Sequence, residues 1–193
     1  NGSQTTYDLT NAWNVTFWTY TSANVDCAYF DGSYNSQLYN LSMSFPPSPT
    51  QTVLMRIYIT GTNSSVYQTL YHIWIDIPNG KLWSWFKYNT WLCIWDWAWW
   101  YEAIKYWNIN GDWHLIANVT NWVSSNQYLD DGSIPYQWFT NALSWTQTYI
   151  YVWWEDNWSG RLTWYMSSLI VEDRVWTVTE IQNYYYQTKW NYG

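Results

Sequence analysis

The sequence predicts an all-β protein, a jelly-roll β-sandwich of two antiparallel sheets with one short C-terminal helix. Short runs that alternate apolar and polar residues recur along the chain and are rich in β-branched and aromatic types. Turn signals such as Asn79-Gly80 and Asp131-Gly132 separate these runs. Only the C-terminal part carries a helix-start pattern. At 193 residues the chain suits one domain over residues 1–193.

The predicted strands follow in order along the chain. In residues 13–20, Val15 and Phe17 share the inner face, whereas Asn14 faces outward. In residues 113–120, Leu115 and its apolar neighbours form the inner face and Asn118 lies on the polar side with His114. The other predicted strands cover residues 53–60, 70–77, 82–86, 148–154 and 162–171.

The last element is the predicted helix over residues 178–187. Thr177 and Glu180 have the spacing of a capping box, in which both side chains satisfy backbone amides at the helix start. Ile181 and Tyr185 are one turn apart and are expected on the inner face. The proline-rich segment at residues 45–49 cannot continue a sheet ladder and is expected to be a connection.

Four short motifs lie along about 150 residues of the chain. They are Phe30-Asp31-Gly32-Ser33, Gly111-Asp112-Trp113-His114, Tyr128-Leu129-Asp130-Asp131-Gly132, and Leu162 followed by Thr177-Val178-Thr179-Glu180-Ile181. In these motifs and their order the chain resembles laminin-G-like, or concanavalin A-like lectin and glucanase, domains. The resemblance implies two packed sheets in a concanavalin-like jelly roll and says little about function.

Composition points to an unusual surface. Charged residues are 11% of the chain and aromatics 24%, with 21 Trp and 20 Tyr. A net charge of -7 without a basic stripe argues against binding nucleic acid. No apolar stretch reaches the roughly 18 residues of a membrane-spanning helix. The chain starts at Asn1, which fits a removed signal segment or an artificial boundary, and we expect an extracellular, secreted protein.

Cysteines and glycosylation sequons support that location. Cys27 and Cys93 are expected to form one disulfide, and two buried free thiols are the alternative. Six Asn-X-Ser/Thr sequons exceed chance modestly, so some are expected to carry covalent N-glycans. They begin at Asn1, Asn14, Asn40, Asn63, Asn118 and Asn157.

The sequence offers little catalytic machinery and predicts a non-enzymatic protein without a required cofactor. Asp76 lacks a second carboxylate two residues away, and the adjacent pairs Glu155-Asp156 and Glu172-Asp173 point to opposite faces of a strand. His72 and His114 are interpreted as structural. A calcium ion remains an alternative, held by Asp130, Asp131 and Asp156, although turn aspartates more often bond their own backbone.

The aromatic block at residues 91–107 departs from the family pattern and has three interpretations: plain core, a subunit interface or a sugar-stacking platform. Our first functional hypothesis is a glycosylated structural or adhesive subunit that self-associates into a homo-oligomeric or polymeric surface assembly, such as a filament, sheath or virion exterior. The alternative is a carbohydrate-binding, lectin-like module, and an atypical glycoside hydrolase is third. The residues expected to serve as interface or sugar platform are Trp95, Trp97, Trp99, Trp100 and Trp107.

Overall fold

The computed structural model describes fourteen strands, the C-terminal helix with the 3-10 turn that follows it, and several turns. The residues that the structure describes are 10–13, 15–20, 24–32, 37–40, 50–61, 68–74, 82–87, 91–96, 101–106, 111–121, 125–132, 136–137, 149–152 and 163–192.

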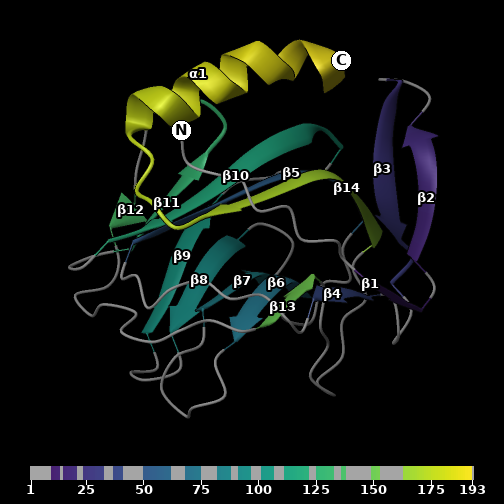
Figure 1. Cartoon of the computed structure of the whole chain (residues 1–193), viewed down its shortest axis with the longest axis horizontal. Helices are drawn as coiled ribbons and strands as arrows, with labels where there is room; N and C mark the ends of the chain where they lie inside the picture. Colours follow the sequence, from purple (N-terminus) through teal and green to yellow (C-terminus); the bar gives the residue numbers. More distant parts are fainter. Residues whose placement is uncertain are drawn as a thin grey trace.

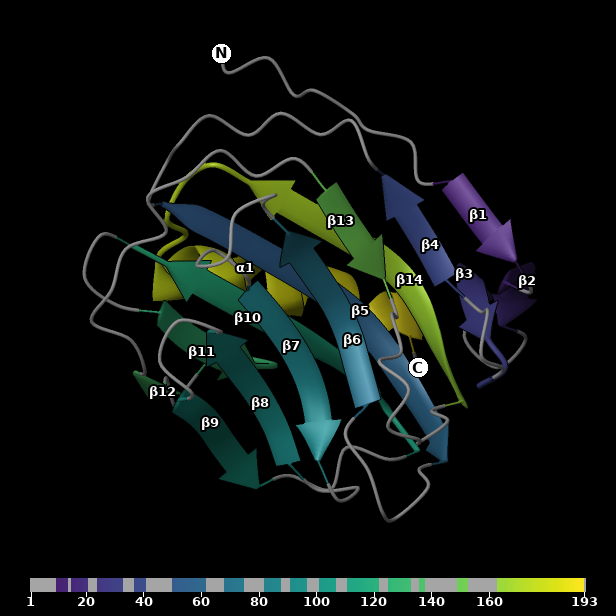
Figure 2. The same cartoon turned by 90° about the horizontal axis from the view of Figure 1, so that it is seen from below.

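Two seven-stranded antiparallel sheets stack on each other within these residues (Figure 1). The helix-side sheet has the order β12 (Tyr136–Gln137), β11 (Ser125–Leu129), β10 (Trp113–Thr120), β5 (Gln51–Gly61), β14 (Thr163–Glu172), β3 (Val25–Phe30), β2 (Val15–Tyr20). The far sheet, which Figure 2 shows from below, has the order β1 (Thr10–Trp13), β4 (Gln37–Asn40), β13 (Tyr149–Val152), β6 (Gln68–Trp74), β7 (Leu82–Lys87), β8 (Trp91–Asp96), β9 (Tyr101–Tyr106). The predicted sandwich of two antiparallel sheets is confirmed.

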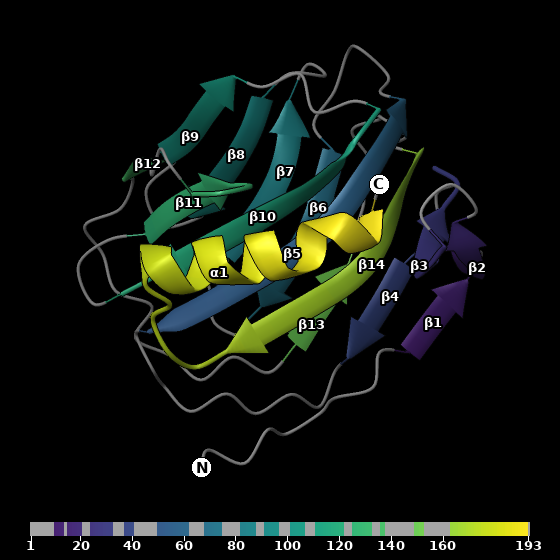
Figure 3. The ribbon, with the colours of Figure 1, turned by 90° about the horizontal axis from the view of Figure 1, so that it is seen from above.

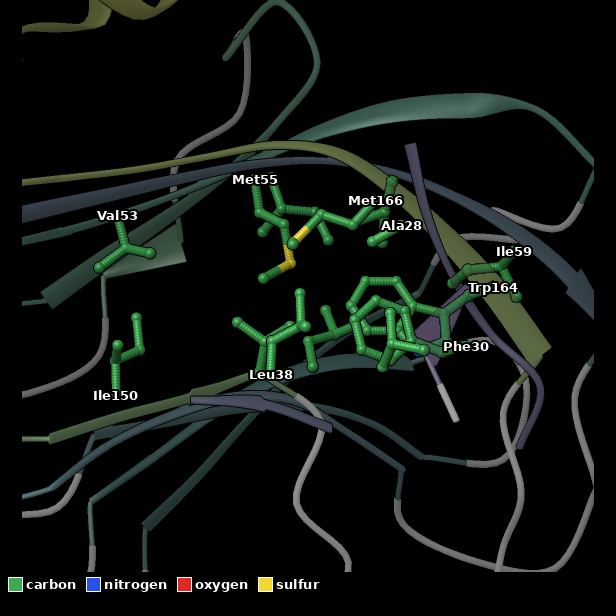
Figure 4. Packing of buried hydrophobic residues seen from close by; sticks show 14 residues of the cluster. Ala28, Phe30, Leu38, Val53, Met55, Ile59, Ile150, Trp164 and Met166 are labelled. Atoms are coloured by element: carbon green, nitrogen blue, oxygen red, sulfur yellow. The ribbon is translucent and has the colours of Figure 1, made fainter. Parts of the chain in front are cut away.

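The main core fills the space between the sheets (Figure 4). Alternate residues of β5, such as Met55 and Ile57, point into it, and Leu38 of the far sheet belongs to the same buried cluster. Within the same core the ring of Trp164 stacks on that of Phe30, with ring centroids 4.4 Å apart. Each fully buried side chain of this kind contributes about 1.5–3 kcal/mol by leaving water.

A second core lies on the outer face of the helix-side sheet. Helix α1 (Val178–Thr188) crosses β5, β10 and β14 there, as Figure 3 shows. Its capping box is formed as predicted, because Thr177 accepts from the Glu180 amide and Glu180 accepts from the Thr177 amide. Ile181 is fully buried against Leu54 and Leu115, and Tyr185 packs beside it. No helix among the described residues is long and apolar enough to cross a membrane.

The prediction for residues 13–20 is wrong in two respects. These residues are not one strand, since β1 belongs to the far sheet and β2 to the helix-side sheet. Phe17 is 65% exposed, although Val15 on the same side of β2 is buried opposite Phe30. The hairpin of β2 and β3 rises from the far sheet toward the C-terminal end of α1 (Figure 1), and the inner face of its outer strand, β2, is buried at Val15 but not at Phe17.

The remaining strand predictions agree with the described elements. Residues 113–120 coincide with β10, and 53–60, 82–86 and 162–171 fall on β5, β7 and β14 with ends shifted by a few residues. β6 covers the described part of 70–77 and begins two residues earlier, and β13 covers the described part of 148–154. The proline-rich segment at 45–49 lies outside the described residues.

Candidate functional site

Four aromatic residues form a continuous row across the helix-side sheet. Trp113 of β10 lies opposite Tyr58 of β5, Tyr58 lies opposite Tyr165 of β14, and Tyr165 lies opposite Tyr29 of β3. The neighbours of the three tyrosines along their strands, such as Trp164, point into the main core. Because strand side chains alternate, the row lies on the outer face, the same face that α1 covers further along.

A tight turn sets the start of this row. Gly111 has φ +84, a conformation that favours glycine, and its amide donates to the Ile59 carbonyl at 2.9 Å. Asp112 Oδ1 then accepts from the Trp113 amide at 2.7 Å. Together they bring the chain back beside β5 so that Trp113 begins β10 opposite Tyr58.

Tyr20, from the end of β2, completes the aromatic cluster, by which we mean Tyr20, Tyr29, Tyr58, Trp113 and Tyr165. Its ring centroid lies 5.1 Å from those of Tyr58 and Tyr165 and 5.5 Å from that of Trp113. The Tyr29 and Tyr165 rings are 4.8 Å apart. These separations and tilts are those that aromatic pairs prefer, so the cluster is a packed unit.

The cluster combines a buried floor with a partly exposed rim. Trp113 is 7% exposed, whereas the four tyrosines keep intermediate exposure. Helix α1 ends next to it, because Arg56 Nη2 donates to Thr188 Oγ1 at 2.6 Å and the guanidinium lies 5.3 Å from the ring centroid of Tyr185. Arg56 is two residues before Tyr58 on β5, so the helix covers the sheet up to the edge of the cluster.

Two phenols of the cluster, Tyr58 and Tyr165, have a raised pKa. The pKa of Tyr58 is raised to about 12, first by its hydrogen bond with the Tyr20 side chain and then by burial and nearby negative charge that includes Asp112. Burial also raises the pKa of Tyr165. At neutral pH Tyr58 and Tyr165 therefore present neutral hydroxyl groups that both donate and accept hydrogen bonds.

The tryptophans that the sequence analysis selected as an interface or sugar platform do not belong to the aromatic cluster. Trp95 lies on β8 of the far sheet, opposite Trp83 and Glu102, and only its strand position is described. The predicted residues that lie outside the described part of the chain are Trp97, Trp99, Trp100 and Trp107.

The predicted disulfide between Cys27 and Cys93 is wrong in this structure. Cys27 is a buried free thiol on β3, and burial raises its pKa. Cys93 lies on β8 of the far sheet, next to the edge strand β9. Strand β3 is next to the edge strand β2 of the helix-side sheet, and these two edges are at opposite ends of the sandwich (Figures 1 and 2). The fold thus separates the two strands, and a disulfide needs Cα atoms within about 7 Å.

The expectation that Asn118 lies on the solvent-facing side of its strand is also wrong. Its side chain is 1% exposed, and its Oδ1 accepts from Gln127 Nε2 of the neighbouring strand at 2.9 Å. Its face of β10 is the one turned toward the main core, because the apolar face of the strand packs under α1. Asn40 ends β4, and the sequons at Asn1, Asn14, Asn63 and Asn157 lie outside the described residues.

The turn aspartates are used within the protein. Asp130 has φ +55, its Oδ1 accepts from the Leu115 amide at 3.0 Å, and its Oδ2 pairs with His114 Nδ1 at 2.8 Å. Asp131 is partly exposed beside it, and Asp156 lies outside the described residues. Within the described part of the chain, no three His, Cys, Asp or Glu side chains are grouped so that they could hold a metal ion.

Sequence reasoning did not select the tyrosines of the cluster. Within β5 and within β14, the alternation places Tyr58 and Tyr165 on the face that points away from the main core. This pattern can be read from the sequence of each strand alone. The register that joins residues from β3, β5, β10 and β14 is a property of the folded sheet and has no local signal.

Comparison with known proteins reveals a likeness of fold. Neither a family model nor a curated protein matches the sequence. Among solved structures, the type G botulinum neurotoxin receptor-binding domain superposes with a TM-score of 0.68 at 10% identity, over 94% of this chain and 46% of that one. A type C neurotoxin, whose cell entry depends on interaction with two ganglioside molecules, gives 0.68 at 9% identity over 93% and 46%.

The type DC binding domain in complex with rat synaptotagmin II gives the same score, identity and coverage as type C. This chain therefore spans somewhat less than half the length of the domains it resembles. At such low identity the likeness establishes the architecture only. The chain has a β-sandwich fold similar to part of these receptor-binding domains.

Proposed function

We propose that this chain is a non-catalytic extracellular domain that binds glycans through the aromatic cluster. The single observation that carries the proposal is the row of Tyr29, Tyr165, Tyr58 and Trp113, held in register over four strands and joined by Tyr20. This row supports the lectin-like hypothesis with a specific site, so we place glycan binding first.

The chemistry of the cluster suits a sugar ring. A sugar has an apolar face of C–H groups and a rim of hydroxyls, so it binds surfaces that offer aromatic contact beside neutral hydrogen-bonding groups. Tyrosine supplies both in one rigid side chain at a low cost in conformational entropy. The packed rings fix one another, so little ordering is required on binding.

Charge favours neutral over acidic glycans. Exposed Asp112 lies close enough to contribute to the raised pKa of Tyr58, so a negative charge stands beside the site. The whole chain carries a net charge of -7, which adds long-range repulsion of anions. We expect uncharged oligosaccharides to bind more tightly than sialylated or sulfated ones of the same backbone.

The structural comparisons support the proposal at the level of fold. The similar domains belong to proteins described with ganglioside molecules or with synaptotagmin II, and those partners are properties of the neurotoxins. The match covers 46% of each of these chains. A β-sandwich serves well as a rigid base for a surface site, and the glycan assignment itself depends on the aromatic cluster.

A glycan array followed by calorimetric titration tests the proposal. Tyr165→Ala removes the ring that contacts Tyr20, Tyr29 and Tyr58, and we expect affinity for a neutral glycan to fall at least about tenfold. The matched control is Tyr186→Ala, which removes a 48% exposed tyrosine from α1.

Two further outcomes decide the matter. Tyr165→Phe should retain most of the binding, because the ring remains and only one hydroxyl is lost. If no glycan binds, or if Tyr165→Ala and Tyr186→Ala weaken binding equally, the aromatic cluster is not the site.

A further inference from the structure

The two described sheets have four edge strands, and three of them are protected against pairing with another chain. β12 has only two residues, and β1 has four with an irregular register between Asn11 and Trp13. β9 carries two charged residues, Glu102 and Lys105. Short strands, irregular register and edge charges are the usual means by which proteins block edge-to-edge association.

β2 has none of these protections. It is six residues long, pairs with β3 in an unbroken register and has the sequence VTFWTY, which contains no charge and no proline. In Figures 1 and 3 it is the outermost strand on its side of the helix-side sheet. An uncharged, regular edge strand of this length presents a row of backbone groups that can pair with another strand.

The side chains of β2 add an apolar contact to that edge. Phe17 is 65% exposed at the middle of the strand, and Thr16 and Thr19 are exposed on either side of it. Among the β3 residues that pair with β2, Asp26 is the one acidic residue, and its Oδ1 accepts from Thr19 Oγ1 at 2.8 Å. β2 itself therefore carries no charged residue, in a chain whose net charge is -7.

We propose that β2 is a homotypic docking edge, at which two copies of this chain pair their β2 strands antiparallel about a two-fold axis. A second copy is the occupant because the strand is uncharged, so self-pairing brings no like charges together despite the acidic chain. A two-fold axis perpendicular to the sheet requires that two residues paired across the dimer have their side chains on the same face of the sheet. A register centred on Phe17 meets this condition and places Phe17 opposite its own copy.

The geometry of such a dimer has a consequence for ligand binding. A two-fold axis perpendicular to the sheet turns the outer faces of both helix-side sheets in the same direction. The two aromatic clusters would then face one surface together and could bind a multivalent glycan by avidity. The pairing itself depends only on β2 and stands whether or not the clusters bind sugar.

Sedimentation velocity of the full chain over a concentration series tests the pairing. A single six-residue edge buries less than the roughly 1,200–2,000 Å² of a stable interface, so we expect a weak monomer–dimer equilibrium seen at high concentration. Phe17→Lys should weaken dimerisation at least about tenfold, since it opposes two like charges at the axis. Val175→Lys, which adds the same charge at an exposed valine after β14, should leave it unchanged.

A cross-linking experiment tests the register without depending on how Phe17→Lys folds. Phe17→Cys under mild oxidation should give a disulfide-linked dimer, because directly opposite Cβ atoms lie within the reach of a disulfide. Val175→Cys should give no disulfide-linked dimer. The unmodified chain measures the background of cross-linking through Cys27 and Cys93. The proposal is overturned by a chain that stays monomeric at high concentration, by a dimer insensitive to Phe17→Lys, or by failure of Phe17→Cys to cross-link.

Discussion

Helix α1 is predicted to stabilise the whole domain, and Ile181→Ala is the variant that measures how much. Ile181 is fully buried between the helix and the sheet, in contact with the cluster that includes Leu54, Leu115 and Tyr128. Removing a buried isoleucine to alanine costs about 2–5 kcal/mol, because apolar contacts are lost and a cavity remains. For a domain of this length a loss of about 3 kcal/mol corresponds to a fall in Tm of about 6–12 °C.

Denaturation by urea, followed by intrinsic fluorescence, measures this difference. The control is Asn183→Ala, which changes an exposed residue of the same helix and should alter stability by less than about 0.5 kcal/mol. An Ile181→Ala variant within about 1 kcal/mol of the parent would show that the helix is not docked on β5 and β10 as the structure has it.

Four further predictions follow from single sites. The pKa of Glu180 is lowered, mainly by its hydrogen bond with the Thr177 amide. The ionised side chain therefore stabilises the fold above the pKa of Glu180 in the unfolded chain, and this stabilisation is lost as the pH falls through its pKa in the folded protein. Glu180→Gln should flatten the acid limb of the pH–stability curve. The pKa of Tyr58 is raised to about 12. Stability should therefore decline above about pH 10, because Tyr58 ionises there in the unfolded chain but not yet in the folded protein. Tyr58→Phe should remove one late-titrating phenol from an ultraviolet pH titration. Mass mapping of the protein expressed in a host that N-glycosylates its secreted proteins should find the Asn118 peptide unglycosylated, and a sugar there would contradict the burial of Asn118. Cys27 should be alkylated only after unfolding, with no reductant required, and alkylation that depends on reductant would restore the disulfide.

Local sequence patterns determined the elements whose causes are local. The strand at Trp113–Thr120 was predicted with its observed bounds, because the alternation and the Gly111 turn lie within a few neighbouring residues. The start of α1 was predicted for the same reason, since Thr177 and Glu180 satisfy each other's backbone within one turn. Enough such elements in order were sufficient to predict a two-sheet sandwich.

Only the tertiary structure decided which face of a strand is the inner one. Alternation in β10 separates Leu115 from Asn118 but does not reveal that a helix covers the apolar face, which turns Asn118 toward the main core. When both faces of a strand are covered, period-2 patterning no longer distinguishes inside from outside. The prediction for Phe17 failed for a related reason, because β2 extends beyond the sheet that would have covered it.

The candidate site depended even more on tertiary structure. Tyr29, Tyr58, Trp113 and Tyr165 are far apart in sequence and meet because three pairs of strands adopt one register, while Cys27 and Cys93 are kept apart by strand order. Sequence alone determined that aromatic side chains were too numerous for the core and would occupy other surfaces. Which aromatics gather, and on which face, was decided by long-range strand pairing, because register couples residues through backbone hydrogen bonds that no local segment encodes.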